Sequence, residues 1–361
     1  MNREPDLFSS ELDAVLVTSV DNIRYTTGFH TAARRPAQIG QTAALLLPDR
    51  ALLFCPANWA DVAGMVVNSG IEIVPYRGDY VQLTESIVPF LTENMRIGFE
   101  EEDIEFRFHR LLNGKCNAAW IDTSEVFRRK RLIKSEDEIE KLRRSARLAS
   151  ETMEHAVTLL KPGKTEWQVV SELEFYMRER GSAGTPFTIK VLAGDNALRT
   201  INLPGDRVME RGDIVLIDMG ALVEGYASDW TRSFVLGKPT QDQRELYELV
   251  YRLEQECIAR IRAGVGYDEL MQVAYKFLAG HRFEKYFNPF LGHNIGLSSQ
   301  ELPNIIPGSN EIFAADSVVT IEPGIYVPGV GGVRIEDEVL VKESGVEMLT
   351  GLKEEIFELS C

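Results

Sequence analysis

The sequence is poor in cysteine and contains no long hydrophobic run. Its cysteines are scattered and form no C-x-x-C pair: Cys55, Cys116, Cys257 and Cys361. This usage is typical of reduced thiols and predicts a cytoplasmic protein. No stretch approaches the roughly 18 apolar residues of a membrane span, and the opening MNREPDLFSS has no apolar signal core. We therefore expect neither a membrane anchor nor a secretory signal.

Positive charge is also scarce. The chain has 39 Lys and Arg against 55 Asp and Glu, which gives a formal net charge of −16. An acidic protein repels phosphate backbones and anionic membrane surfaces, so nucleic acids and membranes are not expected partners. Its electric field favours cations instead, either metal ions or substrates that carry an amine.

A chain of 361 residues is long for a single core and predicts two domains. In the first third, strand-like segments alternate with one helical pattern, over residues 13–20, 42–55, 58–70 and 71–76. This alternation indicates a small α/β domain over residues 1–130. The basic run 128–131 is interpreted as the solvated charge of an interdomain linker.

The second part of the chain combines capped helices with strands in hairpins. Capping boxes predict three helix starts, at Ser135 with Glu138, Thr165 with Gln168, and Thr240 with Gln243. The first of these helices should run to about Leu160. Strand-like segments occupy residues 215–234, 317–327 and 331–341. These patterns predict an α+β domain over residues 135–361 rather than a βαβ array.

Acidic residues interrupt these strand-like segments, and a histidine lies in a Gly-rich apolar stretch: Asp218, Asp229, Glu322, Glu336 and His293. Any one of them alone is best explained as a hydrogen-bonded core residue. Together, four carboxylates in one small core would repel each other, and Arg334 could pair with only one. Two divalent ions would balance them, with the histidine as a neutral fifth ligand. One imidazole among oxygen ligands suits Mn, Co, Zn or Fe.

Five segments resemble, in order and spacing, the signatures of the pita-bread metallopeptidases: IDMG, SDWTR, GHNIGL, IEPGIY and VRIEDEV. That family includes methionine aminopeptidases, aminopeptidase P and prolidase. The resemblance runs from about residue 135 to the end, and DNIRYTTGF (21–29) resembles the creatinase-type N-terminal domain of the prolidase branch. It implies an α/β N-terminal domain before a pita-bread catalytic domain, which is built from two similar αβ halves, and a homodimer.

The resemblance also assigns roles to single residues. It implies that the metal ligands are Asp218, Asp229, His293, Glu322 and Glu336. It further implies that Glu322 handles the proton of a metal-bridging hydroxide, which attacks the amide carbon before proline. Arg334, Tyr226 and Thr231 would orient ligands. Arg199, in a loop rich in glycine and proline, is a candidate partner for a substrate carboxylate.

Three positions depart from the family pattern. Where prolidase-like enzymes carry further histidines, this sequence has Ile201, Pro289 and Gln300. Of these, only Gln300 offers a side-chain hydrogen-bond donor, and loss of one donor to a tetrahedral intermediate typically costs on the order of 10²–10³ in rate. Three interpretations stay open. They are an Xaa-Pro peptidase with a rebuilt substrate wall, an ectoine-hydrolase-like enzyme that cleaves a non-peptide C–N bond of a small molecule, and a binding module without activity.

Overall fold

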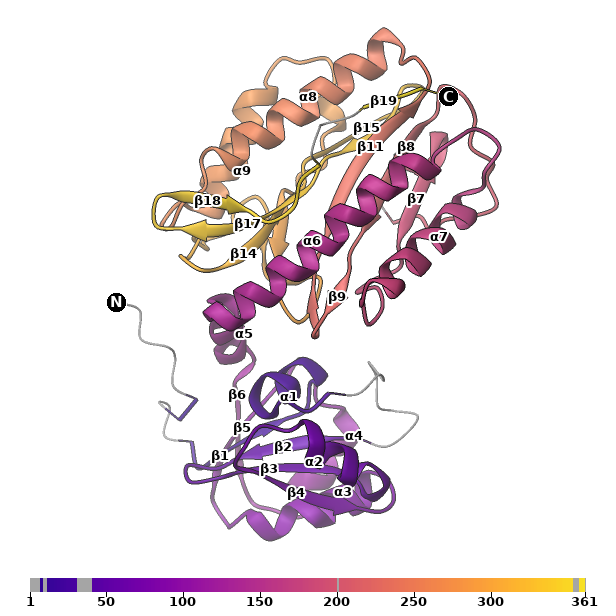
Figure 1. Cartoon of the computed structure of the whole chain (residues 1–361). Coiled ribbons are helices and arrows are strands. Elements are labelled where there is room, and N and C mark those ends of the chain that lie inside the picture. The colour runs from indigo at the N-terminus through magenta and orange to yellow at the C-terminus, as the bar shows by residue number, and fades with distance from the viewer. Residues whose placement is uncertain (1–6, 9–11, 31–40, 200, 353–356, 361) are drawn as a thin grey trace. The chain divides into compact units, whose positions relative to one another are not determined.

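The computed structural model describes residues 7–8, 12–30, 41–199, 201–352 and 357–360 (Figure 1). Its contacts divide the chain into two compact units, Met1–Arg131 and Leu132–Cys361. Among the described residues, no helix is both long and apolar enough to cross a bilayer. Cys55, Cys116 and Cys257 are free thiols, and Cys361 lies outside the described residues.

The first unit is an α/β domain, as predicted. Its sheet has the strand order β4-β3-β2-β1-β5-β6, in which β1 pairs antiparallel with β2 and parallel with β5. The strands are β1 (Ala14–Val17), β2 (Ala43–Leu46), β3 (Ala51–Pro56), β4 (Ile71–Tyr76), β5 (Arg96–Phe99) and β6 (Ala119–Asp122). The helices are α1 (Val20–Thr27), α2 (Ala60–Val66), α3 (Tyr80–Ile87), α4 (Phe106–Asn113) and α5 (Ser124–Leu132).

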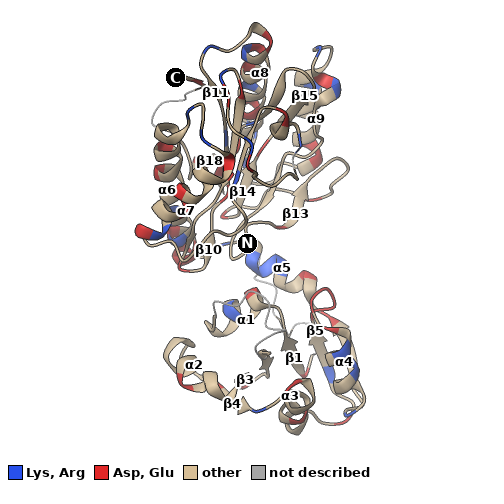
Figure 2. Cartoon of the chain, turned by 90° about the vertical axis from the view of Figure 1, so that its right-hand side faces the viewer, with Lys and Arg blue, Asp and Glu red and all other residues tan. Residues whose placement is uncertain are grey.

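The basic run 128–131 is helical and lies at the predicted junction, since the boundary between the two units follows Arg131. It lies inside α5, which Figure 2 shows as a blue segment. Arg128 and Arg129 each contact Glu125, at 2.7 and 2.6 Å. Residues three and four apart face each other on a helix, so these pairs stabilise α5. The charges therefore belong to a folded element of the first unit.

The helices of the second unit begin where the capping boxes predict. Reciprocal side-chain and backbone bonds are present at Ser135, Thr165 and Thr240. The helices are α6 (Glu136–Leu159), α7 (Glu166–Glu179), α8 (Gln241–Ile258) and α9 (Tyr267–Leu278). The predicted end of the first helix near Leu160 is confirmed, since Leu160 is its C-cap.

The strands of the second unit form mostly antiparallel sheets, which confirms the α+β prediction. One sheet has the order β19-β11-β8-β7 and another the order β13-β12-β14-β17-β18. The first contains β7 (Lys190–Ala193), β8 (Ile214–Met219), β11 (Trp230–Leu236) and β19 (Glu358–Leu359). The second contains β12 (Gly292–Asn294), β13 (Glu301–Ile305), β14 (Val318–Ile321), β17 (Asp337–Lys342) and β18 (Gly345–Met348). Two small hairpins add β9 (Leu222–Val223) with β10 (Tyr226–Ala227), and β15 (Gly324–Val327) with β16 (Gly331–Arg334).

Two hydrophobic cores divide this unit into halves. One core joins α6 and α7 to strands β7, β8 and β11 (Figure 1). The other joins α8 and α9 to the strands from β13 to β17, with single residues of β8 and β11. At the seam, the amide of Glu336 donates to the carbonyl of Thr231 at 3.1 Å. The hydroxyl of Ser233 donates to the carbonyl of Arg334 at 3.0 Å and accepts from its amide at 3.1 Å. One backbone bond and two bonds of a serine hydroxyl therefore tie β11 directly to the chain that enters β17.

Candidate metal centre

The five predicted ligand residues come from both halves of the second unit. Asp218 lies in β8, and Asp229 directly precedes β11. His293 lies in β12, Glu322 directly follows β14, and Glu336 lies between β16 and β17. Asp229 and the two glutamates are therefore at strand ends, and of the four acids predicted in strand interiors only Asp218 lies within a strand. Pro323 explains one of these ends, since proline has no N–H to continue a ladder.

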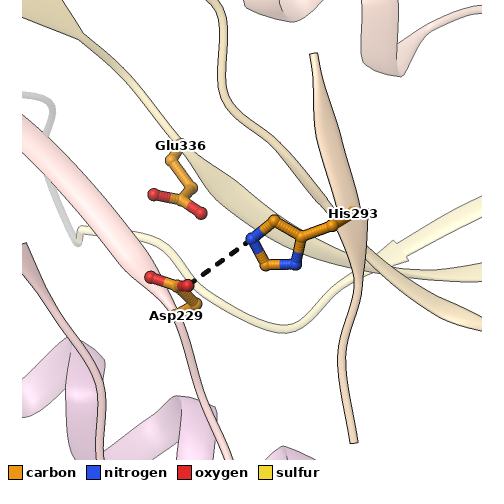
Figure 3. Close-up of side chains that lie close together, drawn as sticks. All are labelled: Asp229, His293 and Glu336. Atoms are coloured by element: carbon orange, nitrogen blue, oxygen red, sulfur yellow. Dashed lines mark ion pairs between the residues drawn. The ribbon is translucent and has the colours of Figure 1, made fainter. Parts of the chain in front are cut away.

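Three of these side chains point at one another. Asp229, His293 and Glu336 each offer a donor atom, and these atoms lie within 4.8 Å of one another (Figure 3). Nε2 of His293 is 3.6 Å from Oδ2 of Asp229 and 3.3 Å from Oε1 of Glu322. The side chains of Asp229 and Glu322 are each 13% exposed, so water reaches the cluster only partially.

The imidazole of His293 is held in one orientation. Its Nδ1 is 3.0 Å from the carbonyl oxygen of Asn294. Because a carbonyl can only accept, Nδ1 carries a hydrogen, and Nε2 faces the carboxylates. The hydroxyl of Thr320 accepts from the amide of His293 at 3.2 Å and donates to Oε1 of Glu322 at 3.3 Å. One threonine thus positions two of the candidate ligands.

Arg334 and Thr231 connect the remaining carboxylates. Nη2 of Arg334 donates to Oδ2 of Asp218, and Nε donates to Oγ1 of Thr231 at 3.1 Å. Thr231 in turn donates to Oε2 of Glu336 at 2.5 Å. Nη1 of Arg334 donates to the hydroxyl of Tyr326 at 3.2 Å. Arg334 and Thr231 therefore contact candidate ligands, and their orienting roles stay a prediction.

The carboxylates carry more negative charge than the protein itself neutralises. Burial raises the pKa of Asp229 well above its usual range, and the charges of Glu336 and Asp218 raise it further. Burial, with the charges of Glu322 and Asp218, also raises the pKa of Glu336 to about 8. Burial works to raise the pKa of Asp218 as well, but Arg334 and Lys190 outweigh it and hold that pKa below its usual value. A cation beside Asp229 and Glu336 would relieve this repulsion.

Two buried oxygen atoms indicate where such a cation fits. Oδ1 of Asp218 and Oε1 of Glu336 have no hydrogen-bond partner among the described residues. A buried acceptor without a partner is costly, and a divalent ion would satisfy both atoms. Together with the oriented imidazole, the oxygen donors form a set that suits a transition-metal ion. The residues present therefore fit a divalent metal.

Comparison with known proteins agrees with this site. Residues 140–343 match the family model of metallopeptidase family M24, and residues 7–133 match that of the creatinase/prolidase N-terminal domain. The chain belongs to metallopeptidase family M24. A Bacillus subtilis protein named uncharacterized peptidase YqhT is 32% identical over 349 residues, which cover 96% of each chain.

Solved structures show that the whole M24 chain, including its first unit, has a prolidase-like fold. An Xaa-Pro dipeptidase from Bacillus anthracis superposes with a TM-score of 0.88 at 30% identity, covering 97% of this chain and 96% of that one. A prolidase from Pyrococcus furiosus gives a TM-score of 0.86 at 28% identity, covering 96% and 98%. The predicted arrangement, a creatinase-type domain followed by a pita-bread domain, is confirmed.

The other predicted site residues of this M24 protein make contacts outside the cluster or are exposed. The hydroxyl of Tyr226 donates to Oε1 of Glu138 at 3.0 Å, which ties it to α6 and gives no support to an orienting role. Gln300 is exposed and donates to Asn304 at 3.3 Å. Arg199 is exposed, and Ile201 is 90% exposed. A role in substrate binding remains a prediction for Arg199 and Gln300.

Sequence reasoning missed two charged residues near this site. Lys190, at the start of β7, places its Nζ 2.8 Å from Oδ2 of Asp218. Glu166 is fully buried at the start of α7 and accepts from the amides of Ala193 and Gly205, at 2.7 and 2.8 Å. It thereby anchors both ends of the loop that carries Ile201. Neither contact follows a local spacing rule, since each partner is at least 27 residues away.

Proposed function

We propose that this M24 metallopeptidase is an Xaa-Pro peptidase, which cleaves the bond before proline in small peptides. The observation that carries the proposal is the buried convergence of Asp229, His293 and Glu336. The substrate class is supported by the likeness, over 97% of the chain, to a structure titled Xaa-Pro dipeptidase. We assign catalysis to the second unit, over residues 135–361, and place the creatinase-type domain at residues 1–130.

The metal ligands in this proposal are Asp218, Asp229, His293, Glu322 and Glu336. A bound Mn, Co, Zn or Fe ion would polarise the scissile carbonyl and lower the pKa of a water. These residues offer enough donor atoms for two ions.

The chain's own residues supply position and proton transfer. Glu322 would act as general base, because it is 13% exposed and its Oε1 is fixed by the hydroxyl of Thr320 at 3.3 Å. Thr231 holds one oxygen of Glu336 and leaves the other without a hydrogen-bond partner. The Nδ1–H bond of His293 keeps Nε2 directed at the cluster. The site would therefore be shaped before any ligand enters.

A second candidate function is hydrolysis of a non-peptide C–N bond in a small molecule. It is favoured by Ile201, Pro289 and Gln300, which stand where prolidase-like enzymes carry histidines. Without those donors, a tetrahedral intermediate of a peptide would have fewer side-chain partners. The cluster itself serves either reaction. A binding module without activity is the weakest candidate, because it has no use for a set of buried metal donors.

The proposal also includes a cellular location and an oligomeric state. A cytoplasmic location rests on the scattered cysteines, which are typical of reduced thiols. A homodimer rests on the resemblance to the prolidase branch. Light scattering coupled to size-exclusion chromatography should give about twice the chain mass of 40.6 kDa. A mass equal to one chain would remove the homodimer from the proposal.

The deciding experiment is a hydrolysis assay on metal-free protein reloaded with Mn²⁺ or Co²⁺. The substrates are Ala-Pro, Ala-Pro-Ala and Ala-Ala-Ala, scored by the free amino acid released. Asp229→Asn should abolish activity. Asp242→Asn is the control, because Asp242 is half exposed and pairs with Arg282 on the surface.

The outcomes separate the candidates. Metal-dependent cleavage before proline, lost only in Asp229→Asn, supports the Xaa-Pro peptidase. Bound metal without cleavage of any peptide contradicts it and favours a small-molecule C–N substrate. Absence of metal binding contradicts both hydrolases and leaves the binding module.

A further inference from the structure

Lys190 places a positive charge on one of the candidate metal ligands. It begins β7 and stands opposite Asp218 in the antiparallel register of β7 and β8. Nζ lies 2.8 Å from Oδ2 of Asp218, and the lysine side chain is 26% exposed. Arg334 donates to the same oxygen. Two cations of the protein therefore share one oxygen of Asp218 and leave only Oδ1 open.

The charges in contact at the site set a limit on added cations. Ligating carboxylates are ionised, so Asp218, Asp229, Glu322 and Glu336 contribute four negative charges. Lys190 and Arg334 contribute two positive charges at neutral pH. The sum is a net charge of −2, which one divalent ion neutralises. A second ion would leave an excess of positive charge among ligands that are at most 13% exposed, and uncompensated buried charge is costly.

The geometry also separates the converging donor atoms from Asp218 and its two cationic partners. The donor atoms that converge belong to Asp229, His293 and Glu336, within 4.8 Å of one another, with Glu322 3.3 Å from the imidazole. Asp218 instead faces Lys190 and Arg334. The side of the cluster that holds His293 is thus arranged for an added cation, while the side that holds Asp218 has cations of its own.

We propose that the ammonium group of Lys190 takes the place of a second metal ion, so that the chain binds one divalent ion among the five predicted ligands, on the side of the cluster that holds Asp229, His293, Glu322 and Glu336. This inference rests on the proposed metal-dependent function and defines its stoichiometry. It replaces the expectation of two ions drawn from the acidic residues alone. Lys190 acts here as a positioning residue for Asp218, not as a group that touches the substrate.

The test is the number of ions bound per full-length chain. Chelator-stripped protein is titrated with Mn²⁺ by calorimetry, and the metal content is measured again after gel filtration. The wild type should bind one ion and show the electron paramagnetic resonance spectrum of an isolated Mn²⁺. Lys190→Met removes the charge and keeps a similar length, so this variant should bind two ions and show an exchange-coupled spectrum.

Two further variants serve as controls. Lys190→Arg keeps the charge and should bind one ion. Lys164→Met removes a lysine that lies 2.8 Å from Glu172 in the same unit, the same distance as in the Lys190 pair, and should also bind one ion. Circular dichroism confirms that each variant is folded.

Each outcome decides the inference. One ion in the wild type and two in Lys190→Met support it. Two ions in the wild type overturn it and leave the metallopeptidase proposal standing. One ion in both overturns it as well, since the charge of Lys190 then does not set the number. No bound ion in the wild type overturns both the inference and the proposed function.

Discussion

The ion pair of Arg232 with Asp337 adjoins the candidate ligand Glu336 and allows a quantitative prediction. The two side chains are 3% and 4% exposed. Nη2 of Arg232 contacts both carboxylate oxygens, at 2.8 and 3.1 Å, and Nη1 donates to the carbonyl of Glu336 at 2.8 Å. Asp337 also accepts from Nε1 of Trp230 at 3.0 Å and from Thr350 at 2.8 Å. The pair thus holds the backbone of Glu336, a candidate ligand.

Replacing Asp337 by asparagine keeps its shape and removes its charge. The guanidinium of Arg232 stays buried without this countercharge, which we expect to cost roughly 3–5 kcal/mol of unfolding free energy. Arg232→Met should cost less, because the buried carboxylate that it leaves can be neutralised by a proton. The double variant removes both charges. Its cost should fall below the sum of the single costs by roughly 0.5–3 kcal/mol, the usual coupling of contacting residues.

Urea unfolding followed by tryptophan fluorescence measures these differences, since Trp230 is fully buried beside the pair. The control is Asp242→Asn, which removes an exposed acid of the same unit and should change stability by less than about 0.5 kcal/mol. A loss below about 1 kcal/mol in Asp337→Asn would refute the reasoning. So would strictly additive costs in the double variant, because the two charges would then not interact.

Further predictions concern the metal centre and the core. Thr231→Val removes the hydroxyl that bridges Arg334 and Glu336 and should weaken Mn²⁺ binding roughly 10–100-fold by calorimetry, whereas unchanged affinity would contradict the bridging role. Mn²⁺ at 100 times its dissociation constant should stabilise the wild type by about 2.7 kcal/mol, seen as a higher melting temperature that a chelator reverses; no shift would argue against a site in the native state. Gly220→Ala should destabilise the second unit, because a Cβ at that position would lie 1.8 Å from the carbonyl oxygen of Ser228; a melting temperature like that of Gly351→Ala, where the space is open, would contradict this. Burial, with the charge of Asp337, raises the pKa of Glu254 well above its usual 4.5, so the folded protein holds a proton that the unfolded chain releases as the pH rises. Glu254→Gln should therefore gain stability over the wild type by up to about 1.4 kcal/mol per pH unit above pH 4.5, and a difference that does not change with pH would refute the shift.

Sequence patterns predicted much of this fold and its candidate site because the signals that they contain are local. Capping boxes at Ser135, Thr165 and Thr240 place helix starts within a few residues, since a cap is a contact between neighbours. Acidic residues within apolar stretches of sequence are conspicuous because burial without a partner is costly. That conflict with the surrounding pattern identified Asp229 and Glu336 without any knowledge of their contacts.

The contacts that sequence patterns could not predict depend on the register of paired strands and on partners far apart in the sequence. Lys190 meets Asp218 only because β7 and β8 pair in one particular register. Glu166 has the position of an ordinary acid in the first turn of a helix, yet it is buried and anchors a loop. The helical conformation of the basic run 128–131 was not predicted, although the spacing of Arg128 and Arg129 from Glu125 is that of neighbours on a helix.

The seam between β11 and the chain entering β17 has a consequence for how the protein meets its metal supply. The bonds of Glu336 with Thr231, and of Arg334 with Ser233, join the two halves of the second unit directly. Candidate donor groups on either side of the seam are therefore held by the fold itself, and little conformational entropy is lost when such groups bind a ligand. We expect the candidate site to take up added ions without refolding of the chain.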